Sequence, residues 1–168
     1  MHIAILAKKG RDRYLRAMSV ILNRCTLPGQ ATLNIEDCAF RENHAHWGGA
    51  LCNYGGTVTI DYSDFIGNYA YDGGATTNER RPTETTAPIG IVDYCTFNDN
   101  TARSGGAFAA INMDRTEPGT VSTITNRDFQ NNVAGIGNAI CIQSPSVDNL
   151  DDVNNGNTYG ANQNIVIS

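Results

Sequence analysis

The sequence has little charge, few basic residues and no long apolar run. Only 17% of its 168 residues are charged and the net charge is −5, which does not suit a nucleic-acid binder, because such a protein carries a basic patch. No stretch approaches the about 18 consecutive apolar residues of a membrane-spanning helix. We therefore predict no nucleic-acid partner and no membrane span, in a chain long enough for one domain with a buried core.

Motifs that carry well-known chemistry are also missing. The five cysteines contain no Cys-x-x-Cys pair, which excludes a zinc ribbon, and no phosphate-binding loop, G-x-S-x-G or H-E-x-x-H sequence occurs. The apolar run at residues 3–7 is too short for a secretory signal, and Lys8 and Lys9 follow it instead of preceding it. No signal peptide is therefore visible.

The chain does contain a repeated phrase, F-x-x-N-x-A-x-x-G-G-A, in three complete copies and a fourth, degraded one. The copies begin at Phe40, Phe65, Phe97 and Phe129, at steps of 25, 32 and 32 residues. A fixed phrase joined by connectors of variable length is typical of a solenoid, in which each repeat stacks on the last. The 17 glycines and the scarcity of helix formers favour short strands joined by turns.

Each repeat is predicted to contain two short strands rich in β-branched residues. The strands after Gly-Gly are expected at residues 50–53, 75–78, 107–110 and 139–142, and the strands before Phe at 33–36, 58–62, 89–94 and 121–125. The segment between them is either a third short strand or a corner. Residues 165–167 are expected to form a closing strand.

The repeat length indicates the architecture. About 25 residues with several short strands and no helical pattern fit one rung of a parallel β-helix, whereas a propeller blade is longer and a leucine-rich repeat has its own leucine spacing. We predict an all-β solenoid of about five rungs over residues 18–168. Residues 1–17 are predicted to be an N-terminal cap or extension, because an uncovered end exposes apolar side chains and unpaired backbone. Residues 10–24 fit an amphipathic helix, and strands at 3–7 and 19–23 are the alternative.

Stacking places equivalent residues of neighbouring rungs about 4.8 Å apart. The four phenylalanines are then expected to stack inside, and four asparagines are expected to form a hydrogen-bonded ladder at a turn. These asparagines are Asn43, Asn68, Asn100 and Asn132. The Gly-Gly pair is expected where a side chain would clash or where φ must be positive.

The F-x-x-N and G-G-A sequences resemble the repeats of the polymorphic outer-membrane proteins, and more widely the extracellular right-handed parallel β-helix proteins of the pectate-lyase-like superfold. The resemblance covers roughly residues 18–143. It implies a right-handed parallel β-helix in an extracellular or cell-surface protein. In the family it resembles, such repeats often form passenger or stalk regions with adhesive or structural roles.

Four residues before Phe, the first three copies carry the carboxylates Glu36, Asp61 and Asp93. On adjacent rungs they would stand about 5 Å apart, a spacing that raises pKa values or attracts a hard cation such as Ca²⁺. Some β-helix polysaccharide lyases are similar in holding Ca²⁺ on stacked acids, but a lyase also needs a base, and only Arg127 lies near in register. The alternative is an outward-facing polar row.

The positions before Gly-Gly gather large polar and aromatic residues on neighbouring rungs. The candidate ligand-binding residues there are His44, His46, Trp47, Tyr69, Tyr71, Asp72 and Arg103. Aromatic faces with polar neighbours are typical of sugar-binding surfaces, whereas two histidines alone are too few for zinc, which takes three or four ligands. The alternative is an exposed corner or a contact with another chain.

The cysteines also follow the repeat. Cys38 and Cys95 occupy the same place two rungs apart, roughly 9–10 Å, which is too far for a disulfide. We expect both to be small buried thiols inside the solenoid. Cys25 lies in a connector.

The function predicted from these features is that of a non-enzymatic extracellular or cell-surface structural or adhesive β-helix protein that self-assembles end to end into filaments. The expected partners are further copies of the chain or another cell-surface protein. The alternative is a carbohydrate-binding or polysaccharide-degrading, lyase-like protein that uses Ca²⁺.

Overall fold

The structure is a computed structural model that describes residues 2–5, 20–24, 31–81, 87–112, 120–143, 158–159 and 165–167. Over these residues the chain is all strand and turn, and the strands stack in parallel as a β-solenoid. No helix in the described part of the chain has the length and apolar character needed to cross a membrane.

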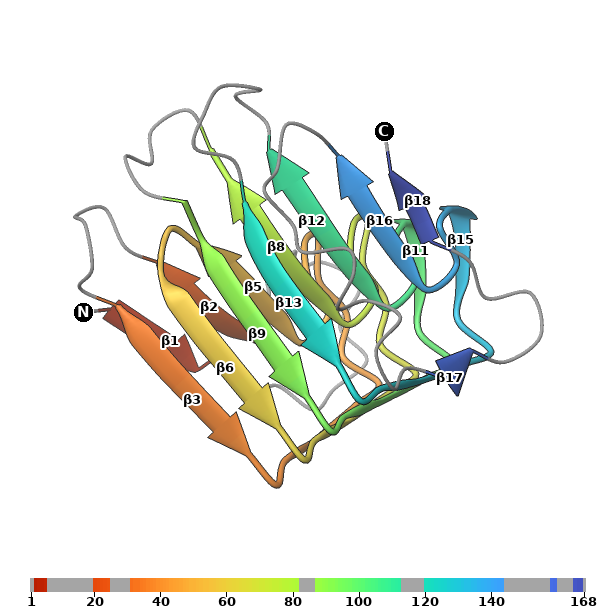
Figure 1. The fold of residues 1–168 in the computed structure, drawn as a ribbon, viewed down its shortest axis with the longest axis horizontal. Coiled ribbons are helices and arrows are strands. Elements are labelled where there is room, and N and C mark those ends of the chain that lie inside the picture. Colours follow the sequence, from red (N-terminus) through yellow and green to blue (C-terminus); the bar gives the residue numbers. More distant parts are fainter. Residues whose placement is uncertain are drawn as a thin grey trace.

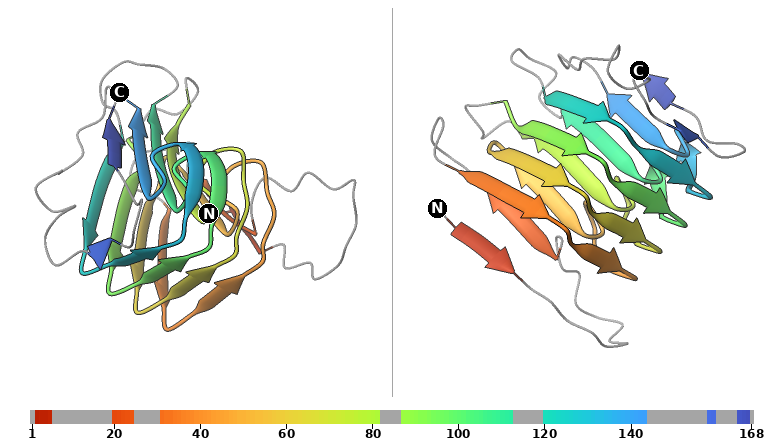
Figure 2. Two further views of the ribbon diagram at one scale, coloured as in Figure 1. Left: turned by 90° about the vertical axis from the view of Figure 1, so that its right-hand side faces the viewer. Right: turned by 60° about the horizontal axis from the view of Figure 1, so that its bottom comes forward.

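Three sheets run along the solenoid, and the core lies between them (Figure 1, Figure 2). The first sheet contains β1 (His2–Ile5), β2 (Ile21–Arg24), β5 (Leu51–Tyr54), β8 (Thr76–Arg80), β12 (Phe108–Asn112), β16 (Ile140–Gln143) and β18 (Ile165–Ile167). The second contains β3 (Thr32–Glu36), β6 (Thr57–Asp61), β9 (Ile89–Asp93) and β13 (Val121–Thr125). The third contains β4 (Ala39–Arg41), β7 (Asp64–Ile66), β10 (Thr96–Asn98), β14 (Asp128–Gln130) and β17 (Thr158–Tyr159). A two-stranded sheet of β11 (Thr101–Ser104) and β15 (Val133–Ile136) completes the later rungs.

The strand predictions are confirmed to within one or two residues at each end, and the segment after Phe is a third short strand. Successive rungs pair in parallel and in the register of the repeated phrase, with Phe40 beside Phe65 and Phe65 beside Phe97. The closing strand at residues 165–167 is also confirmed.

The N-terminal region follows the strand alternative where it is described. Strand β1 pairs antiparallel with β2 and covers that edge of the first sheet. The predicted helix falls mostly on residues 6–19, which lie outside the described residues, and residues 21–24 are a strand. The remainder of the proposed cap also lies outside the described residues.

The number of turns is smaller than predicted. The chain makes about three turns, because the four strands of the second sheet are separated by three passages around the axis. Beyond the fourth rung, the described strands are β16 and β17, which pair with β12 and β14, and β18, which stacks on β16 as the next strand of the first sheet. The prediction of about five rungs counted the C-terminal stretch as a full rung, although it has lost the repeated phrase.

The interior contains the predicted ladders. Successive phenylalanine rings are nearly parallel, with centroids 4.9, 4.9 and 5.3 Å apart. Phe65, Phe97 and Phe129 are fully buried, whereas Phe40 in the first rung is partly exposed. Burying each large apolar side chain contributes about 2 kcal/mol, so this column is a main source of the stability of the solenoid.

The predicted asparagine ladder is present at the turn after Phe. Nδ2 of each asparagine donates to Oδ1 of the next, at 2.8, 2.9 and 3.0 Å from Asn43 to Asn132. The same oxygens also accept backbone N–H groups of the preceding rung. A second ladder, which the sequence reasoning did not identify, joins Asn23, Asn53 and Asn78 at 2.9 Å per step.

The Gly-Gly pair has the predicted role. Gly73 has a φ of +62°, and a Cβ there would lie 2.2 Å from the carbonyl oxygen of Thr76. A Cβ on Gly74 would lie 2.0 Å from the carbonyl oxygen of Gly106. The first glycine therefore supplies a left-handed turn and the second allows neighbouring rungs to approach closely.

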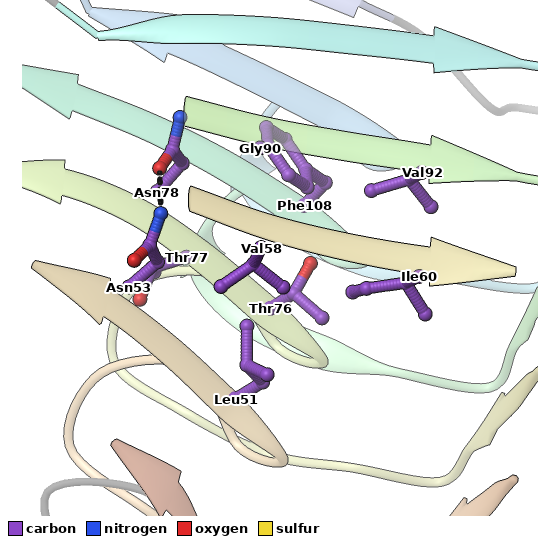
Figure 3. A pocket seen from close by; sticks show the side chains of 10 residues that line it. All are labelled: Leu51, Asn53, Val58, Ile60, Thr76, Thr77, Asn78, Gly90, Val92 and Phe108. Atoms are coloured by element: carbon purple, nitrogen blue, oxygen red, sulfur yellow. Dashed lines mark hydrogen bonds between the residues drawn. The ribbon is translucent and has the colours of Figure 1, made fainter. Parts of the chain in front are cut away.

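Thr76 is a polar residue in an apolar column of the interior. It lies between Leu51 and Phe108 in register, and within the described ranges its hydroxyl has no hydrogen-bond partner. Figure 3 shows it beside Val58 and Ile60, at a cavity of about 10 Å³, which is barely room for one water molecule.

We predict that Thr76→Val stabilises the protein by about 1 kcal/mol, because it keeps the shape and removes a buried, unpaired hydroxyl. Urea unfolding measures the change. The adjacent Thr77→Val is the matched control, since the Thr77 hydroxyl bonds Cys52 Sγ at 3.0 Å, and it should not gain stability. A Thr76→Val variant less stable than the native chain would contradict the prediction.

Candidate functional site

The predicted aromatic corner is brought together by the register of the rungs. His44, Tyr69 and Thr101 are bridged in one row, and Trp47, Asp72 and Ser104 in another. Between these rows, the Tyr71 N–H donates to the carbonyl of His46 at 2.9 Å, and the Arg103 N–H donates to that of Tyr71 at 2.8 Å. The backbone hydrogen bonds between rungs thus fix the position on the corner from which each of these side chains extends.

The side chains of this corner stack along the solenoid axis. The rings of His44 and Tyr69 have centroids 5.5 Å apart, and those of His46 and Tyr71 are 5.4 Å apart. The Arg103 guanidinium lies 4.3 Å from the centroid of the Tyr71 ring. Tyr69 and Tyr71 are nevertheless about half exposed, so a partner can reach them.

Asp72 is the buried anion of the corner. It is 5% exposed, and its Oδ1 lies 3.6 Å from Arg103 Nη2. In the part of the chain that the structure describes, no residue forms a hydrogen bond with this oxygen or with Nδ1 of His46. Asp72 and Arg103 therefore form an ion pair at the corner, and these two atoms are buried inside it.

Trp47 contacts a buried charged cluster that the sequence reasoning missed. The Arg81 guanidinium lies between two rings, 4.6 Å from the Trp47 centroid and 4.0 Å from that of Tyr54. Arg81 Nη2 also donates to the Tyr54 hydroxyl, and its Nε donates to Glu79 Oε1 at 2.9 Å. The period-2 alternation of residues 77, 79 and 81 on one face of a strand was the signal that could have revealed the cluster.

Glu79 is fully buried, and its Oε2 has no hydrogen-bond partner among the described residues. Burial raises the pKa of this carboxyl group above the ordinary 4.5, and the charge of Asp72 adds to the rise, although Arg81 opposes it. Burial likewise raises the pKa of the Tyr54 hydroxyl. It raises the pKa of the Cys52 thiol to about 12, so Cys52 stays protonated near neutral pH and is not a nucleophile.

The predicted carboxylate row is in register, with Glu36 beside Asp61 and Asp61 beside Asp93. Asp93 Oδ1 accepts hydrogen bonds from Thr125 at 2.7 Å and Asn126 at 3.0 Å. Although burial raises the pKa of Asp93, these bonds and the nearby charge of Arg127 outweigh that effect, and the net pKa is lowered.

Arg127 is the basic residue that the sequence placed nearest to this row. Its side chain is fully buried, with Nη2 3.4 Å from Asp93 Oδ1. Burial lowers its pKa to about 10, and the charges of Cys95, Asp93 and Asp61 oppose the fall. Over the described residues, no group of three or more His, Cys, Asp or Glu side chains is arranged to hold a metal ion.

A second exposed aromatic feature was also missed. Tyr62 and Tyr94, each the residue after a carboxylate of the row, stack with centroids 5.1 Å apart and an interplanar angle of 3°. Both have positive φ. The repeat alignment could have paired them, but nothing in the sequence indicates the backbone conformation.

Two of the cysteine predictions have different outcomes. Cys95 is buried, as predicted, but Cys38 is exposed, because it lies in the first rung, where the equivalent side chains are less covered. All four cysteines in the described ranges, Cys38, Cys52, Cys95 and Cys141, are free thiols. Cys25 lies outside the described residues.

Comparisons with protein-family models, with curated proteins and with solved structures find no match to this chain. The fold and the geometry of the chain itself therefore carry the functional argument, and the class they define is that of a parallel β-solenoid.

We predict that Glu79→Gln weakens the dependence of stability on pH. A carboxyl group whose pKa is raised by folding favours the folded state fully below its ordinary pKa of 4.5, and this contribution is lost as the pH rises through the folded value. Urea unfolding between about pH 4 and 8 should therefore show the variant gaining on the native chain as the pH rises.

The matched control is Glu42→Gln, at an exposed glutamate, which should follow the native pH profile. A Glu79→Gln profile parallel to the native one would show that the buried carboxyl group does not titrate as its surroundings require.

Proposed function

We propose that this protein is a non-enzymatic structural or adhesive β-solenoid of the cell surface or extracellular space. The aromatic corner of His44, His46, Tyr69, Tyr71 and Arg103 is its binding surface. The observation that carries the proposal is the half-exposed stack in which Arg103 lies 4.3 Å from the ring centroid of Tyr71. Residues at these positions are variable within the phrase and are not needed to build a rung, so they are available for recognition.

The geometry of the corner favours a protein partner over a sugar. The Tyr71 ring has His46 on the side of the preceding rung and Arg103 on the side of the next. A sugar packs on an open aromatic face, and these faces are occupied by the stack. What the corner presents outward is a row of hydrogen-bonding edges of Tyr, His and Arg, residue types enriched at protein interfaces.

The extracellular setting rests on the repeated phrase. Its F-x-x-N and G-G-A sequences resemble those of polymorphic outer-membrane protein repeats, which are displayed on cell surfaces. The structure adds the reason why such a phrase recurs, since each of its fixed residues has a position in the rung.

The lateral surface suits this role better than the two ends. At the N-terminal end β1 pairs antiparallel with β2, which interrupts the parallel stacking on the first sheet that an in-register filament requires. At the other end the first and third sheets finish in the short strands β18 and β17, of three and two residues, and very short edge strands are poor templates for pairing. We therefore favour attachment through the corner over end-to-end assembly.

Calcium-dependent polysaccharide binding or cleavage is the less favoured function. Its support is the in-register row of Glu36, Asp61 and Asp93. One member, Asp93, already accepts hydrogen bonds from Thr125 and Asn126 and pairs with Arg127. The Arg127 guanidinium 3.4 Å from Asp93 Oδ1 opposes a second cation at this position.

The test is a binding screen of the full chain against panels of purified surface and matrix proteins and of polysaccharides with and without Ca²⁺. We predict a protein partner, and at least tenfold weaker binding by Tyr69→Ser/Tyr71→Ser/Arg103→Ser, because large side chains at an interface centre carry most of the affinity. Ile91→Thr, on the exposed face of β9, is the control and should bind normally. Cleavage of a polysaccharide, or unchanged protein binding by the triple variant, would contradict the proposal.

A further inference from the structure

Each of the first four rungs bends between the second and third sheets at one residue with left-handed backbone. These residues are Asp37, Tyr62, Tyr94 and Asn126, with φ between 47° and 52°. The bend itself is part of the fold. The fold does not require a particular residue there, because the rungs use three different residue types for the same conformation.

The two tyrosines are unusual at this bend. Asp and Asn enter the left-handed region readily, whereas a bulky side chain there is a true outlier with an energetic cost. The first and fourth rungs use Asp37 and Asn126, so the turn forms without an aromatic ring. Tyr62 and Tyr94 are therefore strained where the fold offers an unstrained choice.

The rings gain little burial in return. They are parallel to within 3° at 5.1 Å, but Tyr62 is 60% and Tyr94 52% exposed. A stacked aromatic pair adds only a modest contact energy. Backbone strain that folding does not require is typical of functional positions, so this exposed pair is a candidate for recognition.

Carboxylates flank Tyr62 on both sides and Tyr94 on the side of the second sheet. Asp61 and Asp93 directly precede the two tyrosines on the second sheet, and Glu36 extends their row. Asp64 begins β7 on the third sheet, with Arg41 Nη2 3.8 Å from its Oδ2. Near the two tyrosines, Arg127 is fully buried and Arg41 is paired with Asp64, so the four carboxylates make the charge presented to solvent mainly negative.

We propose that the Tyr62–Tyr94 ridge binds a lysine- or arginine-rich segment of a partner protein. Ammonium and guanidinium groups are attracted by aromatic faces and by the adjacent carboxylates. With 60% and 52% of their surface exposed, the rings of Tyr62 and Tyr94 are accessible to such a group. The acidic flanks and the net charge of −5 steer a basic partner to the ridge, and they repel an acidic polysaccharide.

This surface is separate from the aromatic corner, and the tyrosine rings of the two surfaces differ in their contacts with cations. At the corner Arg103 of the chain itself lies over Tyr71. Among the described residues, no cation lies over Tyr62 or Tyr94 in a corresponding contact. At the ridge, a cation from a partner protein can therefore make the kind of contact with a tyrosine ring that Arg103 makes with Tyr71 at the corner.

The test is calorimetric titration of the full chain with a decalysine peptide and, separately, with a decaarginine peptide at low and at physiological salt. The decisive variant is Tyr62→Asn/Tyr94→Asn, which introduces the residue that the fourth rung uses. We expect at least tenfold weaker binding and an unchanged or higher Tm, because the substitution relieves the strained backbone. The substitution leaves the net charge of the chain unchanged. If the peptides bound only by general electrostatic attraction to the acidic chain, their affinity would therefore not fall.

Two further variants control the result. Tyr62→Phe/Tyr94→Phe keeps the rings and should keep the affinity. Val133→Asn, on the exposed strand β15, should bind both peptides normally. The proposal is overturned if the native chain binds neither peptide or if the Asn variant binds them as tightly as the native chain. It is equally overturned if a neutral oligosaccharide binds at the ridge in place of the peptides.

Discussion

Hydrogen bonds between neighbouring rungs are the interaction on which this structure depends. They hold parallel strands at the inter-strand spacing of about 4.8 Å, and so they oblige each residue to sit beside its equivalent in the next repeat. The asparagine ladders extend this constraint to the turns, since each ladder amide bonds the next rung at 2.8–3.0 Å. The phenylalanine column, the Gly-Gly bends and both aromatic surfaces follow from that register.

The same constraint separates residues that build the fold from residues free to act. Rows of identical residues, such as Phe65 and Phe97, are buried, and their side chains pack on one another inside the solenoid. Some rows whose members differ lie instead at exposed corners, as His46, Tyr71 and Arg103 do. In a short solenoid with a filled interior, these corners are the surfaces on which recognition can develop.

Repetition explains which features could be predicted from the sequence. The strands, the phenylalanine column and the Asn43 ladder were predictable because each position occurs several times in equivalent surroundings. The contact of Arg81 with Trp47 and Tyr54 was not, because it occurs once and crosses from a corner to the outer face of a sheet. The left-handed backbone of Tyr62 and Tyr94 was hidden because tyrosine does not usually adopt it. The burial of Cys38 was wrong because a terminal rung is covered on one side only, which no internal pattern reveals.

The most direct test of the account is the free energy of unfolding of Asn100→Ala compared with Asn98→Ala, two residues away. Asn100 is fully buried and its side chain bonds two neighbouring rungs, whereas Asn98 is partly exposed on the surface. The account predicts a loss of about 3 kcal/mol for Asn100→Ala, since several buried groups lose their partners, and less than about 0.5 kcal/mol for Asn98→Ala. Equal losses for the two variants would show that the ladder does not hold the rungs together.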